Sequence, residues 1–131
     1  MTTNTHTDWT RVAALEDEQQ AAWITEHGRN VDESGRREWM RDFVSGTLEQ
    51  DEDNRRRLMG SLLRSLLSME DAEARSYAGD FQWVLDHGKG DAAFAAVQSL
   101  HTGARSLAVE ETMRLSHHWP RIFGKDIAAT L

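Results

Sequence analysis

Two segments of this chain, Trp23–Arg29 and Trp83–Lys89, carry the same order of residue types sixty positions apart. In each segment a tryptophan is followed by a β-branched residue, and an acid, a histidine, a glycine and a cation complete it. A glycine at that point can adopt the left-handed conformation that commonly ends a helix. The pattern therefore predicts that helices end at Gly28 and Gly88, and it allows a chain of two similar three-helix halves.

The composition favours helices along the whole chain. The 131 residues include one proline, Pro120, and are rich in Ala, Leu, Glu, Gln and Arg, which are good helix formers. Apolar residues recur at steps of three and four, as in helices that bury one face. We predict an all-α fold, a compact bundle of about six helices, over residues 9–27, 32–46, 47–67, 68–87, 91–103 and 106–118. Pro120 is expected to end or kink the last of these helices. Residues 1–7 are expected to be a disordered N-terminus, and residues 8–131 a single helical domain whose tail has apolar positions at Ile127 and Leu131.

Polar residues indicate where these helices begin. Asp32 can cap the second helix with its carboxylate. Two pairs have the spacing of a capping box and predict the starts of the third and fourth helices: Thr47 with Gln50, and Ser68 with Asp71. A polar interval within the third segment leaves open a later start, near Asn54.

The charge balance excludes several classes of partner. Twenty-two acids against fifteen lysines and arginines give a net charge of −7, which opposes binding to nucleic acid and to anionic lipid. The run Arg55–Arg57 follows Asp51–Asp53 at the spacing of helix ion pairs, which predicts a neutralised, solvated face. The chain has no cysteine and no apolar N-terminal stretch, so we expect a cytoplasmic protein without a membrane anchor.

The side chains that could carry chemistry do not form a recognisable catalytic motif. Di-metal sites in helical bundles use Glu-x-x-His, and no glutamate here has a histidine three residues later. We predict no catalytic residue, no metal and no cofactor, and expect no catalytic activity from the chain on its own. The alternative is a pocket between the two halves, lined by His27, His87, His101, His117, Asp86 and Glu111. For His27 and His87 a simpler interpretation is a place in the last turn of a helix, where an imidazole relieves the negative end of the helix dipole.

Five tryptophans are distributed along the chain. Tryptophan anchors helical cores and is also enriched at the centres of protein interfaces. All five could be interior, or those near the chain ends could remain exposed. We predict that Trp9 and Trp119 are exposed and that they form an interface together with Ile122 and Phe123, which belong to a tail that could dock as a final turn.

The segment that begins at Asp32 has an acid-rich start, then Trp39, the pair Phe43-Val44, the pair Leu48-Glu49 and the run Asp53-Asn54-Arg55. With these features, the segment of about residues 32–67 resembles a region of the non-catalytic β-type subunits of bacterial multicomponent di-iron monooxygenases. The resemblance implies a helical subunit of ferritin-like architecture that packs against a catalytic partner and holds no iron itself. The chain departs from the family in being far shorter than a complete β subunit. Where the metal-binding relatives have Glu-x-x-His, Glu33 is followed three residues later by Arg36.

These patterns together predict a non-catalytic accessory or scaffold subunit. It would bind a protein partner, such as an oxygenase-type enzyme, or form a homo-oligomer through an apolar face that bears tryptophan. The alternative is a small helical ligand- or metal-binding protein, or an enzyme, that uses the pocket lined by histidines and acids.

Overall fold

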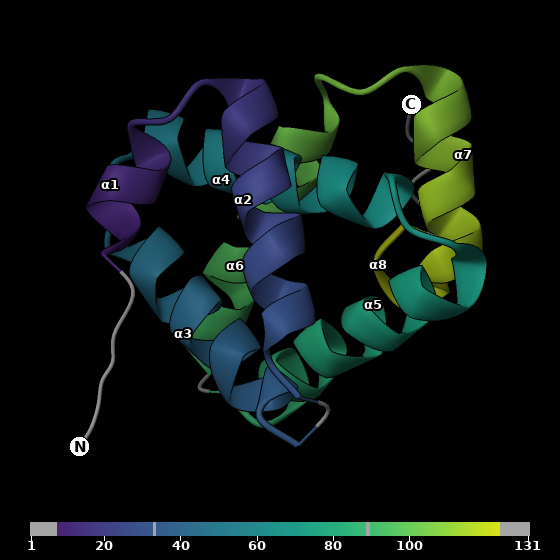
Figure 1. Ribbon diagram of the computed structural model, residues 1–131, viewed down its shortest axis with the longest axis horizontal. Coiled ribbons are helices and arrows are strands. Elements are labelled where there is room, and N and C mark those ends of the chain that lie inside the picture. Colours follow the sequence, from purple (N-terminus) through teal and green to yellow (C-terminus); the bar gives the residue numbers. More distant parts are fainter. Residues whose placement is uncertain (1–7, 33, 89, 124–131) are drawn as a thin grey trace.

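The computed structural model describes residues 8–32, 34–88 and 90–123, and within these ranges every regular element is a helix (Figure 1). The predicted all-α bundle is therefore confirmed. The helices are α1 (Trp9–Ala13), α2 (Asp17–Asn30), α3 (Arg36–Leu48), α4 (Glu52–Leu67), α5 (Asp71–Asp86), α6 (Gly90–Ala104), α7 (Val109–His118) and α8 (Pro120–Phe123). The predicted disorder of residues 1–7 and the tail positions Ile127 and Leu131 lie outside the described residues.

Helix α4 forms the centre of the core. It packs against α2 and α6, while α3 packs against α5. Its apolar residues recur at the helical period, so one broad stripe of the helix faces its neighbours. The side chains of that stripe are at most 1% exposed: Leu58, Met59, Leu62, Leu63 and Leu66. The recurrence of apolar residues at steps of three and four predicts a buried face of this kind.

Glycines allow α4 and α6 to approach closely where they cross. A Cβ atom placed on Gly103 would lie 2.7 Å from the backbone nitrogen of Gly60 and 3.0 Å from the carbonyl oxygen of Arg56. Because these neighbours are backbone atoms, they cannot move aside as a flexible side chain can. The contact therefore fixes the end of α6 against the middle of α4.

A chain of aromatic rings crosses the core from α1 to α8, which lie on opposite sides of the molecule (Figure 1). Trp9 meets Trp23 and Phe43 edge to face, with ring centroids 5.4 and 5.2 Å apart. Three further edge-to-face pairs follow, with ring centroids 6.4, 5.1 and 5.8 Å apart: Phe43–Phe81, Phe81–Trp119 and Trp119–Phe123. Each such pair adds about 0.5–1.5 kcal/mol to the stabilisation from buried area.

The predicted exposure of the chain-end residues is wrong. The exposed fractions are 5%, 3%, 8% and 1% for Trp9, Trp119, Ile122 and Phe123. The helix is interrupted between α1 and α2, so that Trp9 packs on α3. Pro120 begins α8, which returns the last described residues to the core. The indole nitrogen of Trp119 also donates a hydrogen bond to Gln82 at 3.0 Å. These four residues belong to the core of the chain and are not exposed.

The left-handed glycine caps predicted at Gly28 and Gly88 are also wrong. Helix α2 continues through Gly28 to Asn30, Gly88 lies beyond the end of α5, and no described glycine has a positive φ. Gly28 instead leaves room for a neighbouring ring, because a Cβ atom there would lie 2.9 Å from Cε2 of Tyr77. The first and second groups of helices pack against each other, since α4 contacts α6 and α3 contacts α5.

Eight helices, rather than about six, are present in the described ranges. One additional helix arises because residues 14–16 separate α1 from α2. The other arises at Pro120, which was predicted to end or kink a helix and which also begins α8, where the fixed φ of proline suits the first turn.

The helix starts depend on different polar residues from those predicted. Asp51 caps α4, and its carboxylate accepts a hydrogen bond from the backbone nitrogen of Asn54 at 2.9 Å. This agrees with the later start that the polar interval left open. Thr47 is buried inside α3, and the Ser68 hydroxyl donates to a carbonyl of α4, so neither residue begins a helix. Asp32 closes a turn before α3, where its carboxylate accepts from a backbone nitrogen at 2.8 Å.

Candidate functional site

A cleft of about 730 Å³ opens beside α3, bordered by α1 and the end of α2. Several of its residues on α3 follow one another at three- and four-residue steps, which places them on one face of that helix. The lining includes Trp9, Glu38, Trp39, Asp42, Gly46 and Glu49.

Trp9 is held rigidly in the wall of this cleft. Its indole lies against Gly46 so closely that a Cβ atom there would come 2.0 Å from Cδ1 of the ring. The indole nitrogen donates a hydrogen bond to Oδ2 of Asp42 at 3.0 Å. Glycine packing and this hydrogen bond together fix the position of α1 on α3.

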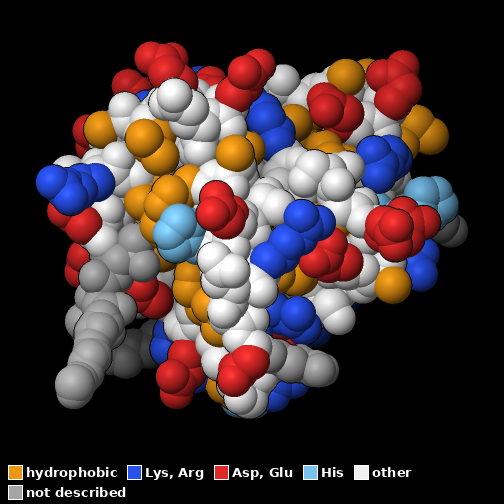
Figure 2. Space-filling model, in the orientation of Figure 1, with side chains coloured by type: hydrophobic (Ala, Val, Ile, Leu, Met, Phe, Trp, Pro, Cys, Tyr) orange, Lys and Arg blue, Asp and Glu red, His pale blue; other side chains and the backbone are white. Residues whose placement is uncertain are grey.

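Two partly buried tryptophans flank Trp9. The ring centroid of Trp39 lies 6.1 Å from that of Trp9, and the centroid of Trp23 lies 5.4 Å away. Trp23 also stacks on the ring of His27, with centroids 3.8 Å apart and an interplanar angle of 17°. We call Trp9, Trp23, Trp39 and His27 the tryptophan face. In Figure 2, hydrophobic side chains gather where α1 and α2 lie in Figure 1, with a histidine among them, whereas acids and cations are mixed over much of the rest of that view.

Acidic side chains border the cleft. Glu38 and Glu49 line it and are exposed. The lining also contains Arg41, but its guanidinium lies over the ring of Trp83, 5.3 Å from the centroid. The cleft therefore combines aromatic surface with a predominantly negative border.

The six residues predicted for an alternative pocket line neither this cleft nor two others that border α4. His27 and His87 occupy the helix ends expected from the simpler interpretation. Each ring stacks on the tryptophan four residues earlier, Trp23 or Trp83. Each Nδ1–H donates to the carbonyl oxygen of that tryptophan, at 3.0 Å for His27 and 2.8 Å for His87. The repeated segments thus share one local arrangement, in which the imidazole stacks on the tryptophan of the preceding turn and donates to its carbonyl oxygen.

The other predicted pocket residues also make local contacts. Nε2 of His101 donates to a backbone carbonyl of α8 at 3.0 Å, and Glu111 accepts from the backbone nitrogen before α7 at 2.8 Å. Asp86 pairs with Arg121 at 2.9 Å, and the hydrogen bonds from that guanidinium lower the pKa of the carboxyl. His117 is exposed on α7. Within the described ranges, no three histidine or acidic side chains are grouped so that they could hold a metal ion.

His118 is a buried titratable residue to which the sequence pattern assigned no role. Neither ring nitrogen has a hydrogen-bond partner, and Nε2 lies 3.6 Å from a carboxylate oxygen of Asp71. Burial lowers the pKa of His118, and the nearby Asp71 only partly opposes this shift. The three-residue spacing from the fully buried Leu115 is the signal that could have placed His118 in the core.

Gln20 is a second buried polar residue that the sequence did not reveal. Its amide nitrogen donates to the carbonyl oxygen of Val12 at 3.0 Å, and its amide oxygen accepts from the Ser61 hydroxyl at 2.5 Å. The side chain thereby joins α1, α2 and α4. It stands in a polar run that carries no mark of burial.

Comparison of the chain with protein-family models, curated proteins and solved structures gives no match. None of the helices in the described part of the chain is both long and apolar enough to cross a membrane. The interpretation of the tryptophan face therefore depends on its own geometry.

Proposed function

We propose that this protein is a non-catalytic accessory or scaffold subunit that binds a protein partner through the tryptophan face. The observation that carries the proposal is the cleft beside α3, which is lined by a rigidly held Trp9 and the partly buried Trp39. The partly buried Trp23 extends this aromatic surface, because its ring contacts Trp9. Tryptophans at interface centres contribute strongly to affinity, because a large ring buries much area and loses little conformational freedom. The proposed interface lies at α1–α3. Of the four predicted interface residues it includes Trp9 and leaves out the buried Trp119, Ile122 and Phe123.

The acidic border specifies the chemistry of the partner. Glu38 and Glu49 favour a partner segment that combines an apolar side chain with lysine or arginine. A second copy of the chain fits less well, because a two-fold interface would bring the same acids together in a molecule of net charge −7. The segment that resembles β-type oxygenase subunits supplies Glu38, Trp39 and Glu49, which makes an oxygenase-type enzyme the proposed class of partner.

The test compares which proteins of the source organism are retained by tagged variants of the full chain. One variant combines Glu38→Lys with Glu49→Lys, and another is Trp39→Ala. The matched control is Glu110→Lys, which reverses the charge of an exposed residue on α7. We expect a protein that the wild type and the control retain equally and that both face variants lose by at least about fivefold, roughly 1 kcal/mol of binding free energy. Retention should also weaken as salt is raised, because rim charges are screened.

Two outcomes would contradict the proposal. Equal retention of every captured protein by the charge-reversed variant and the control would remove the tryptophan face from recognition. Self-association of the purified chain in sedimentation experiments, abolished by the same face variants, would replace the protein partner with a second copy. Circular dichroism of each variant separates loss of binding from loss of folding.

A further inference from the structure

A second cleft, of about 390 Å³, lies between α4, the end of α6 and the start of α2. Four arginines and one acid, Asp17, contribute to its lining, in contrast to the overall negative charge of the chain. The arginines are Arg56, Arg57, Arg64 and Arg105. We propose that this cleft binds a small molecule through a phosphate monoester group, independently of the tryptophan face.

Helix geometry creates the opening. Arg56, Gly60 and Arg64 follow one another at four-residue steps, so they lie along one face of α4. Gly60 has no side chain between the two arginines, and Gly103 packs directly against it. The close crossing of α4 and α6 therefore leaves a cleft flanked by cations.

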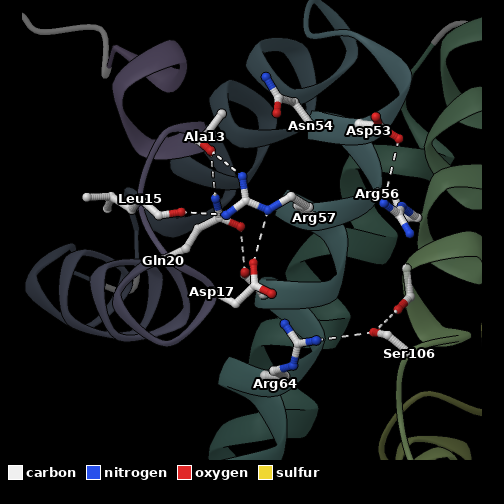
Figure 3. A network of polar contacts seen from close by, with 12 residues as sticks. Ala13, Leu15, Asp17, Gln20, Asp53, Asn54, Arg56, Arg57, Arg64 and Ser106 are labelled. Atoms are coloured by element: carbon white, nitrogen blue, oxygen red, sulfur yellow. Dashed lines mark hydrogen bonds and ion pairs between the residues drawn. The ribbon is translucent and has the colours of Figure 1, made fainter.

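Arg57 has a structural role in this cleft. Figure 3 shows its guanidinium turned toward the turn between α1 and α2. It donates to the carbonyl oxygens of Ala13 at 2.9 Å and Leu15 at 2.5 Å, and its Nε–H donates to Asp17 at 3.0 Å. The predicted neutralisation of the arginine run by the preceding acids is therefore wrong for Arg57, whose acidic partner comes from another helix.

The remaining arginines keep their charge available. Arg64 donates to the neutral hydroxyl of Ser106 at 3.2 Å, and Arg105 is exposed on the turn after α6. Neither has an ion pair with a residue that the structure describes. Arg56 lies 3.6 Å from Asp53, in a pair whose side chains are 52% and 86% exposed, and such surface pairs contribute little.

The ligand class follows from charge and size. A phosphate monoester carries about −1.5 to −2 charges at neutral pH, which matches the uncompensated charge of Arg64 and Arg105. The volume lies within the range of about 300–1,000 Å³ that is usual for small-molecule sites. A small phosphate is favoured over a nucleic acid, because a polyanion would be repelled by a chain with net charge −7.

Calorimetric titration with glycerol 3-phosphate at low salt tests the proposal. We expect saturable binding whose dissociation constant rises about tenfold in Arg64→Gln and in Arg105→Gln, as for the loss of one charge-assisted hydrogen bond. Arg114→Gln removes the same charge from an exposed position on α7 and should leave the constant unchanged. Asp17→Asn should lower the constant, because it removes the acid from the cleft. Arg105 lies on an exposed turn, so its variant is expected to fold even if Arg64→Gln does not.

Several results would overturn the proposal. One is the absence of saturable binding up to about 10 mM glycerol 3-phosphate. Another is an equal loss of affinity in the control variant, which would indicate a general charge effect. Binding of succinate as tight as that of glycerol 3-phosphate would assign the cleft to dicarboxylates instead. A single-stranded oligonucleotide that binds more tightly and depends on Arg64 and Arg105 would assign it to nucleic acid.

Discussion

Gly46 lies inside α3, where it packs against the Trp9 indole. Replacing a glycine by alanine inside a helix ordinarily stabilises it by about 1 kcal/mol. Here the new methyl group would lie 2.0 Å from Cδ1 and 2.5 Å from Cγ of Trp9. Gly79, in the middle of α5, provides a matched control, because a Cβ atom there meets nothing within 4 Å.

The loss of stability in Gly46→Ala depends on how far the Trp9 ring must move. A local shift of the ring corresponds to overpacking, which costs about 1–3 kcal/mol. Complete displacement of the ring resembles removal of a large aromatic side chain, which costs about 3–5 kcal/mol. We take a middle value of about 3 kcal/mol for the cost of the clash. The gain of about 1 kcal/mol in helix propensity offsets part of it, so Gly46→Ala should lower the free energy of unfolding by about 2 kcal/mol. Gly79→Ala should instead be more stable by up to about 1 kcal/mol.

Urea denaturation followed by circular dichroism measures both free energies of unfolding, and tryptophan fluorescence reports the movement of Trp9. A double-mutant cycle adds the decisive control, since Gly46→Ala should no longer destabilise a chain that already carries Trp9→Ala. If Gly46→Ala proved as stabilising as Gly79→Ala in the otherwise unchanged chain, the packing of Trp9 on Gly46 would be refuted.

Two further predictions concern the core. Gly103→Ala should lower the free energy of unfolding by about 1–3 kcal/mol, because its methyl group would meet the backbone of Gly60; unchanged urea midpoints would contradict the close crossing of α4 and α6. His118 has a folded-state pKa below its ordinary value of about 6.5, so it binds a proton more readily in the unfolded chain. The stability that it contributes is present above about pH 6.5 and is lost as the pH falls through the lowered folded-state pKa. His118→Leu should therefore lose less stability than the wild type between pH 7 and pH 5 in urea titrations, and equal losses would count against a buried neutral imidazole.

The sequence by itself determined the helical class and the central helix. The apolar stripe of α4, from Leu58 to Leu66, repeats at a helical period, and that period alone assigns a buried face. The interruption of the helix at Pro120 and the positions of His27 and His87 near helix ends were also predicted. These features depend on residues within about one or two turns, where the backbone geometry fixes the neighbours.

Tertiary structure decided which residues of a given type are exposed or paired. Trp9 and Trp119 were expected at the surface, but the docking of α1 and α8 buries them, and Trp23 and Trp39 remain partly exposed. The sequence marked tryptophan as a candidate for recognition without distinguishing among the five, because a large ring suits a core and an interface equally.

The arginine cleft shows the same limit for charged residues. The spacing of Arg55–Arg57 after Asp51–Asp53 predicts ion pairs within one helix. In the structure Arg57 pairs instead with Asp17, forty residues away. The sequence pattern predicts a helix that ends at Gly103 and says nothing of its neighbours, whereas its contact with Gly60 sets the distance between α4 and α6. Such contacts join segments that are remote in the chain, and a sequence pattern fixes the face of a helix but not the partner that covers it.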